Sequence, residues 1–129
     1  MISRETDYAF RIIRALSAYQ RMSIQQICDQ EHIPLAYAYK IIKKLERAHF
    51  VRIFRGAKGG YELSCDLDEK TFYDVYLAIE GDLFLNACQA GSVCPHRQAE
   101  KPCNVHLTLS EMRQEFIQIM KQRSLRNVI

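Results

Sequence analysis

The chain has 129 residues and a formal net charge of +3, with 48% hydrophobic and 26% charged residues. This length fits one domain with a modest core, and the composition is that of a globular rather than a disordered protein. No stretch approaches the roughly 20 apolar residues that span a bilayer, and the charged N-terminus is unlike a signal peptide. We therefore expect a cytoplasmic protein that does not enter a membrane.

The first half of the chain is predicted to hold three helices. Apolar residues recur at helical spacing over residues 4–20. Ser23 is a natural N-cap for a second helix, and Gln26 follows three residues later, as in a capping box. Pro34 cannot continue that helix but fits the first turn of the next, so a third helix is expected over residues 34–49.

A β-hairpin is predicted after the third helix. Residues 50–55 are rich in β-branched and aromatic side chains, and residues 61–64 form the returning strand. The connection, residues 56–60, reads Gly-Ala-Lys-Gly-Gly and gives the hairpin a basic, flexible tip.

The second half is predicted to contain two helices separated by a loop. Thr71 caps one helix and Gly81 ends it, and the segment 86–104 is an irregular loop. The last helix covers about residues 105–121, followed by a short tail at residues 124–129. Its apolar residues step by four and three, as in a helix that pairs with another: Val105, Leu109, Met112, Phe116 and Ile119.

Three helices followed by a hairpin is the order of a winged helix-turn-helix. We predict a mainly α fold with a small hairpin, in which residues 1–66 form a DNA-binding head. Residues 67–129 would add a helix, the loop and a long dimerisation helix. Charge supports this interpretation, because residues 1–64 carry +5 and residues 65–129 carry −2.

The third helix can enter the major groove with the face that it does not bury, and the hairpin tip suits an adjacent minor groove. A basic face alone is more often merely solvated, so the interpretation rests on the order of the elements. The candidate DNA-binding residues are Ser23, Tyr37, Tyr39, Lys40, Lys43, Lys44, Arg55, Lys58 and Gly59.

Five cysteines, an odd number, argue against a disulfide framework. Cys88, Cys94 and Cys103 are separated by five and eight residues, in a loop that glycine and proline hold open. Thiolates are the usual ligands of iron–sulfur clusters, whereas zinc favours close cysteine pairs that this loop lacks. Thiols used for reversible oxidation are an alternative. Cys28 and Cys65 are expected to be structural.

Several segments carry a resemblance to a known family. They are Thr-Asp-Tyr-Ala at residues 6–9, Arg-Gly-Ala-Lys-Gly-Gly-Tyr at 55–61, Ala-Ile-Glu-Gly at 78–81, the three-cysteine loop and residues 124–129. In these segments the chain resembles the bacterial regulators that include IscR, NsrR and CymR. The resemblance implies homodimers that bind palindromic operators in double-stranded DNA.

The resemblance also implies a cofactor. In cluster-binding members, three cysteines of this loop hold a [4Fe–4S] or [2Fe–2S] cluster, although the second gap here is longer than in IscR. Candidates for the fourth ligand are His106, in a Cys-x-x-His pattern with Cys103; Asp7, which in NsrR-like members comes from the partner; and His32. Asp7 also suits the positive N-terminal end of the first helix.

The function predicted from these features is a DNA-binding transcriptional regulator that senses nitric oxide, redox state or iron–sulfur status through a cluster at the three-cysteine loop. The alternative is a cluster-free repressor of the same fold, regulated by a thiol or a protein partner. An enzyme is not expected, because the sequence offers no pattern of nucleophile, base and orienting group.

Overall fold

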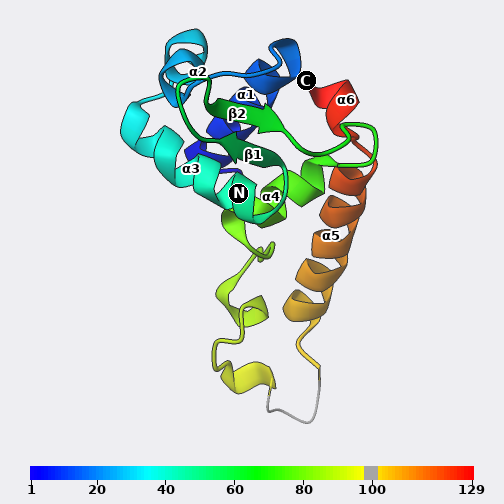
Figure 1. The fold of residues 1–129 in the computed structure, drawn as a ribbon. Helices are drawn as coiled ribbons and strands as arrows, with labels where there is room; N and C mark the ends of the chain where they lie inside the picture. The colour runs from blue at the N-terminus through cyan, green and yellow to red at the C-terminus, as the bar shows by residue number, and fades with distance from the viewer. Residues whose placement is uncertain (98–101) are drawn as a thin grey trace.

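The computed structural model describes residues 1–97 and 102–129, so residues 98–101 of the predicted cysteine loop lie outside the described part. Helices α1 to α4, a hairpin and α6 form a head, and α5 extends from it beside the cysteine loop (Figure 1). Within the described ranges, no helix is long and apolar enough to cross a membrane.

The three predicted N-terminal helices are confirmed as α1 (Arg4–Ala18), α2 (Ile24–Glu31) and α3 (Leu35–Arg47). The predicted capping box opens α2. Ser23 Oγ accepts a hydrogen bond from the Gln26 amide at 3.2 Å, and Gln26 Oε1 accepts one from the Ser23 amide at 2.8 Å. These bonds satisfy amides at the helix start that have no partner within the helix.

The turn between α2 and α3 is held from α1. Glu31 is buried, and its carboxylate accepts hydrogen bonds from the Arg14 guanidinium, including Arg14 Nε at 3.2 Å. Arg11 donates to the Glu31 carbonyl at 3.4 Å. His32 closes α2 in a left-handed conformation, with φ 54°, and Pro34 is the N-cap of α3. An ion pair between the exposed Arg14 side chain and the buried Glu31 carboxylate therefore ties the end of α2 to α1.

The hairpin is confirmed as the antiparallel pair β1 (Val51–Phe54) and β2 (Gly60–Leu63). It is joined to the segment between α1 and α2, because Met22 and Tyr61 exchange backbone hydrogen bonds of 3.1 and 2.7 Å. A side chain at Gly60 would place its Cβ 2.7 Å from the Met22 carbonyl oxygen, so this close approach requires glycine.

Helix α4 (Phe72–Glu80) begins and ends as predicted. Thr71 and Asp74 form a second capping box, and Gly81 ends the helix with φ 85°. Helix α5 (Asn104–Lys121) also follows the prediction. It buries only Ile117 fully and leaves much of its predicted seam exposed.

The short tail predicted at residues 124–129 was wrong. Leu125–Val128 form helix α6, and Leu125 is 0% exposed within the main core beside residues such as Ile12 and Val75. Backbone hydrogen bonds from Leu125 to Lys70 and from Arg126 to Leu67 hold this segment against the head. The end of α5 is therefore anchored in the core.

Candidate nucleic-acid interface and cysteine cavity

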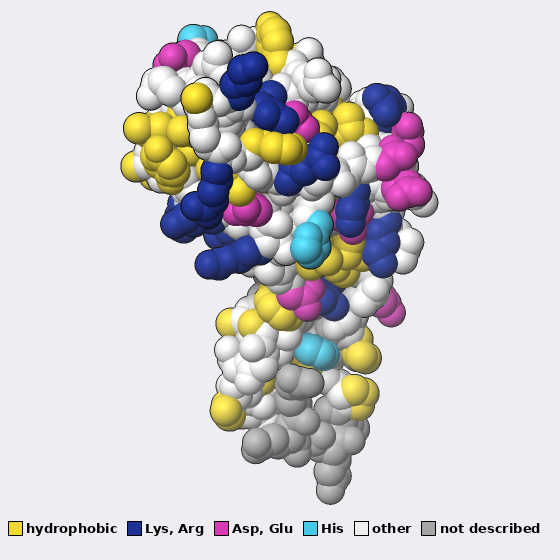
Figure 2. All heavy atoms as spheres, viewed as in Figure 1, with side chains coloured by type: hydrophobic (Ala, Val, Ile, Leu, Met, Phe, Trp, Pro, Cys, Tyr) yellow, Lys and Arg dark blue, Asp and Glu magenta, His cyan; other side chains and the backbone are white. Residues whose placement is uncertain are grey.

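The outer face of α3 presents both aromatic and basic groups. Tyr37 and Tyr39 are 44% and 48% exposed, and Lys43 is exposed as well. The Tyr37 ring packs edge-on against Tyr8 of α1, with 5.8 Å between the ring centroids. Lys and Arg side chains gather over α3 and the hairpin on the face shown in Figure 2. This surface can meet both phosphates and base edges.

Two lysines of α3 are engaged within the chain. Lys40 Nζ lies 2.6 Å from Glu5 Oε1, and Lys44 Nζ lies 2.9 Å from Glu5 Oε2. Lys44 also donates to the Ile79 carbonyl at 2.9 Å. Lys44 was predicted on the outer face, but it is half-buried and reaches toward α1 and α4 instead. Lys40 stays largely exposed.

The hairpin tip carries Arg55 and Lys58, both exposed. Gly59 is required where it stands, because a Cβ there would lie 2.5 Å from the Phe54 carbonyl oxygen. Arg21, which the sequence analysis did not single out, contacts this hairpin from outside it and donates to the Lys58 carbonyl at 3.0 Å. Its position between α1 and α2 gave no local signal of that contact.

Ser23 combines two features of the predicted interface. Its hydroxyl caps α2, and its side chain is half-buried at the N-terminal end of that helix. Amides at such an end favour a negative charge nearby, so a DNA phosphate suits this position.

The cysteine loop and the start of α5 line an open cavity of about 590 Å³. Its lining includes Cys88, Cys94, Cys103 and His106, and all four residues are half-buried. Cys88 Sγ lies 3.4 Å from His106 Nδ1. The structure thus gathers the three predicted thiols and one predicted fourth ligand around one space. The sequence pattern linked His106 to Cys103, whereas the contact is with Cys88.

The other two candidate ligands lie elsewhere in the subunit. Asp7 forms an ion pair with Arg11 at 2.8 Å and is not part of the lining of the cysteine cavity. His32 is exposed at the end of α2. Within one subunit, His106 is therefore the candidate that the fold brings to the cysteines.

The lining of this cavity brings thiol sulfurs and an imidazole together. Among the described residues, no group of three or more His, Cys, Asp or Glu side chains is arranged closely enough to hold one metal ion. Thiolate sulfur and imidazole nitrogen are donors that iron–sulfur clusters accept, so the chemistry of this lining is compatible with that group.

Cys28 and Cys65 differ from the loop cysteines in environment. Cys28 is buried in the head, and Cys65 packs against the same core. Burial is the main cause that raises the pKa of both thiols, which keeps them protonated and unreactive at neutral pH. This agrees with the structural role expected for them.

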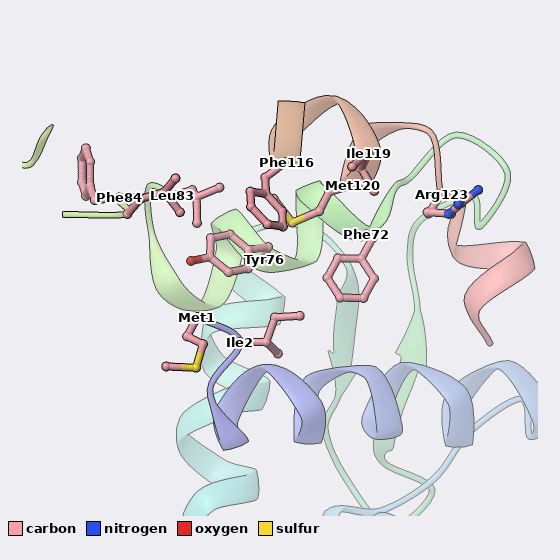
Figure 3. Close-up of a pocket in the computed structure, with 11 residues that line it drawn as sticks. Met1, Ile2, Phe72, Tyr76, Leu83, Phe84, Phe116, Ile119, Met120 and Arg123 are labelled. Carbon is pink, nitrogen blue, oxygen red and sulfur yellow. The ribbon is translucent and has the colours of Figure 1, made fainter. Parts of the chain in front are cut away.

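A second cavity, of about 630 Å³, lies between α4 and α5 and is largely apolar. Phe116, Ile119 and Met120 of α5 face Phe72 and Tyr76 of α4 across it (Figure 3). The N-terminal residues Met1 and Ile2 also contribute to the lining, which no sequence pattern indicated. An apolar hollow beside the exposed seam of α5 is suited to covering by another apolar surface.

Comparison with known proteins gives sequence relatives and structural neighbours. YwgB of Bacillus subtilis, an HTH-type transcriptional regulator by name, is 24% identical over 120 residues, covering 92% of this chain and 75% of YwgB. YffB of Lactococcus lactis, named likewise, is 34% identical over 77 residues, or 60% of this chain. That match is 49% of YffB, so this chain spans about half the length of that relative.

Solved structures share the fold over nearly the whole chain. A transcriptional regulator from Listeria innocua gives a TM-score of 0.79 at 21% identity, covering 99% of this chain and 85% of that one. CymR, the global cysteine regulator of B. subtilis, gives 0.76 at 22% identity, covering 99% and 95%. IscR of T. potens gives 0.73 at 15% identity, covering 99% and 85%. These neighbours confirm the predicted winged helix-turn-helix fold.

The family model of Rrf2, described as an iron-dependent transcriptional regulator, matches residues 2–129. The match includes the three helices, the wing, the cysteine loop and the long helix. Together with the fold, it shows that this chain belongs to the Rrf2 family of transcriptional regulators.

Proposed function

We propose that this chain is a homodimeric, cytoplasmic DNA-binding regulator whose operator affinity depends on an iron–sulfur cluster held in the cysteine cavity. The observation that carries the proposal is the meeting of Cys88, Cys94, Cys103 and His106 around one cavity at the base of α5. We infer a regulator rather than an enzyme, because the family and its relatives are transcriptional regulators.

DNA binding is assigned to α3, the start of α2 and the wing. Tyr37, Tyr39 and Lys43 would contact base edges and backbone in the major groove, and Ser23 and Lys40 would contact phosphates. Arg55, Lys58 and Gly59 of the wing would lie at the adjacent minor groove. Lys44 is assigned a positioning role because Glu5 and the Ile79 carbonyl already hold it.

Dimerisation is assigned to α5. Phe116 and Ile119 are 49% and 53% exposed and border the apolar cavity, so a second α5 would bury them. A two-fold dimer presents two reading heads in opposite orientation, which suits a palindromic operator in double-stranded DNA. We take residues 1–66 as the reading head and residues 67–129 as the part that senses and dimerises.

The loop cysteines and His106 would hold the cluster, and the partner's Asp7 is the alternative fourth ligand. When bound, a cluster supplies iron that responds to oxidants, nitric oxide and iron shortage. Arg113 of α5 donates to the Leu83 carbonyl and, at 2.7 Å, to Asp82. These hydrogen bonds hold α5 against the segment between α4 and Cys88. A change in the conformation of the cysteine loop would therefore be transmitted to the C-terminal end of α4.

The same end of α4 contacts the reading helix, because the Ile79 carbonyl accepts from Lys44. The cysteine loop and α3 are thus both connected to the C-terminal end of α4. A switch of this kind requires that the two loop states differ in DNA affinity, and DNA then biases the loop state in return.

The test begins with iron, acid-labile sulfide and zinc per subunit in protein purified without oxygen. We expect matched iron and sulfide that are lost in Cys88→Ala and retained in Cys65→Ser, the matched cysteine control. His106→Ala and Asp7→Ala then separate the two fourth ligands. Operator affinity of loaded and cluster-free protein is compared at fixed salt, since DNA affinity depends on salt. Equal affinities would refute the switch.

Absence of iron and sulfide after attempted reconstitution would favour the alternative, a cluster-free repressor regulated by a thiol or a protein partner. The likeness to CymR in fold is the observation that keeps this alternative. This alternative predicts that oxidation of the loop thiols, or addition of a partner protein, changes the affinity for the operator without any metal.

A further inference from the structure

One arginine outside the wing contacts the wing at three places. Arg21 lies between α1 and α2, and its Nε donates to Glu62 Oε1 on β2 at 2.8 Å. Its Nη1 donates to the Lys58 carbonyl at the tip at 3.0 Å. The centre of its guanidinium lies 3.7 Å from the centroid of the Phe54 ring on β1. A single side chain thus connects both strands and the tip to the head.

The carboxylate that anchors this arginine is buried. Glu62 is 8% exposed, and it also accepts a hydrogen bond from Arg52 Nη2 at 3.1 Å. The hydrogen bond from Arg21 is the main cause that lowers the pKa of Glu62, so the carboxylate stays charged at neutral pH. Loss of Arg21 would leave a buried charge with one exposed partner, so the contact resists opening.

The tip needs such an anchor. A two-stranded hairpin is marginally stable by itself, and the turn has only the Gly59 amide bonded to the Gly56 carbonyl at 2.9 Å within it. Arg21 holds the carbonyl of Lys58, the residue whose side chain is assigned to DNA. Fixing the tip before binding lowers the entropy that is lost when DNA orders it.

We propose that Arg21 is a positioning residue for the wing, which acts on DNA through Lys58 and the tip rather than by its own contact. The proposal rests on the DNA-binding function proposed above. It assigns to the segment between α1 and α2 a part in minor-groove binding that helix-turn-helix geometry alone does not give it.

The test is a double-mutant cycle on operator affinity at fixed salt. Arg21→Ala is expected to weaken binding about tenfold in the otherwise unchanged chain. In a background that lacks both basic side chains of the tip, Arg55→Ala with Lys58→Ala, it should weaken binding by less than about twofold, because the tip then has little left to position. Equal losses in both backgrounds would overturn the proposal.

Arg21→Lys is the matched variant, since it keeps the charge but loses the planar fork and the stacking on Phe54. If Arg21 acts by positioning the wing, Arg21→Lys should lower the affinity for the operator as much as Arg21→Ala does. Retention of affinity by Arg21→Lys would indicate a direct phosphate contact and contradict the proposal.

Hydrogen exchange of the DNA-free protein separates this proposal from the proposed function. Arg21→Ala should speed exchange of the Gly59 amide while leaving the amides of α3 protected. An unchanged exchange rate of the Gly59 amide would refute the proposed positioning role of Arg21. If the unmodified chain bound no DNA at all, the proposed function would fail. The exchange result would still test whether Arg21 holds the wing in position.

Discussion

The Lys44 ammonium donates to Glu5 Oε2 at 2.9 Å and thereby ties the reading helix to the first turn of α1. The other oxygen of Glu5 holds Lys40 at 2.6 Å, and Lys44 reaches the Ile79 carbonyl as well. The Glu5 carboxylate thus binds two lysines of α3 at the junction of α1, α3 and α4.

The first prediction concerns pH. Hydrogen bonds from Lys40 and then from Lys44 lower the pKa of Glu5 below its unfolded value. The carboxylate therefore stabilises the fold above its unfolded pKa, and that contribution is lost as pH falls through its folded pKa. Glu5→Gln should be less stable than the unmodified chain near neutral pH, and the gap in urea midpoints should shrink below about pH 4. A gap that stays constant would contradict this.

The second prediction compares the two capping boxes. Ser23→Ala and Thr71→Ala each remove an N-cap and should each cost about 1 kcal/mol of unfolding free energy. Only Ser23 lies at the proposed DNA surface, so only Ser23→Ala should also weaken operator binding beyond the shared loss of stability. Chemical denaturation and binding titrations measure both quantities. Equal binding losses would remove Ser23 from the interface.

The third prediction concerns α6. Leu125→Ala should destabilise the protein by about 2–5 kcal/mol, because it opens a cavity in the main core. Val128→Ala, on the exposed side of the same helix, is the control and should change stability by less than about 0.5 kcal/mol. Similar unfolding free energies for the two variants would show that α6 is not part of the core in solution.

The fourth prediction concerns the assembly. Phe116→Asp places a charge in the exposed seam of α5 and should convert the proposed dimer to a monomer in sedimentation experiments. Gln114→Asp adds the same charge at another exposed position of α5 and should leave the dimer intact. A dimeric Phe116→Asp variant would move the interface away from this seam.

Local patterns predicted the elements of this fold well, because their determinants are local. Ser23 and Thr71 mark helix starts through bonds to residues three positions away, and Gly81 marks an end through its own φ. The missed helix α6 depends instead on backbone bonds to Lys70 and Leu67, which are distant in sequence. No periodicity over six residues carries that information.

The candidate sites show the same division. Helical periodicity placed Lys44 on the outer side of α3, but it could not give the reach of a long side chain to Glu5, 39 positions earlier. The cysteine spacing indicated a shared site, and the structure adds the contact of Cys88 with His106, 18 positions later. Arg21 was missed because its partners lie on the hairpin.

The burial of Leu125 bears on the order in which the protein forms during synthesis. The three helices and the hairpin emerge from the ribosome well before residue 125, so part of the head's apolar surface stays uncovered until then. A fragment ending after the hairpin would keep that surface exposed. The core that residues 1–66 share with α4 and α6 is therefore closed only once the long helix has been made, which couples its maturation to the segment that we assign to dimerisation.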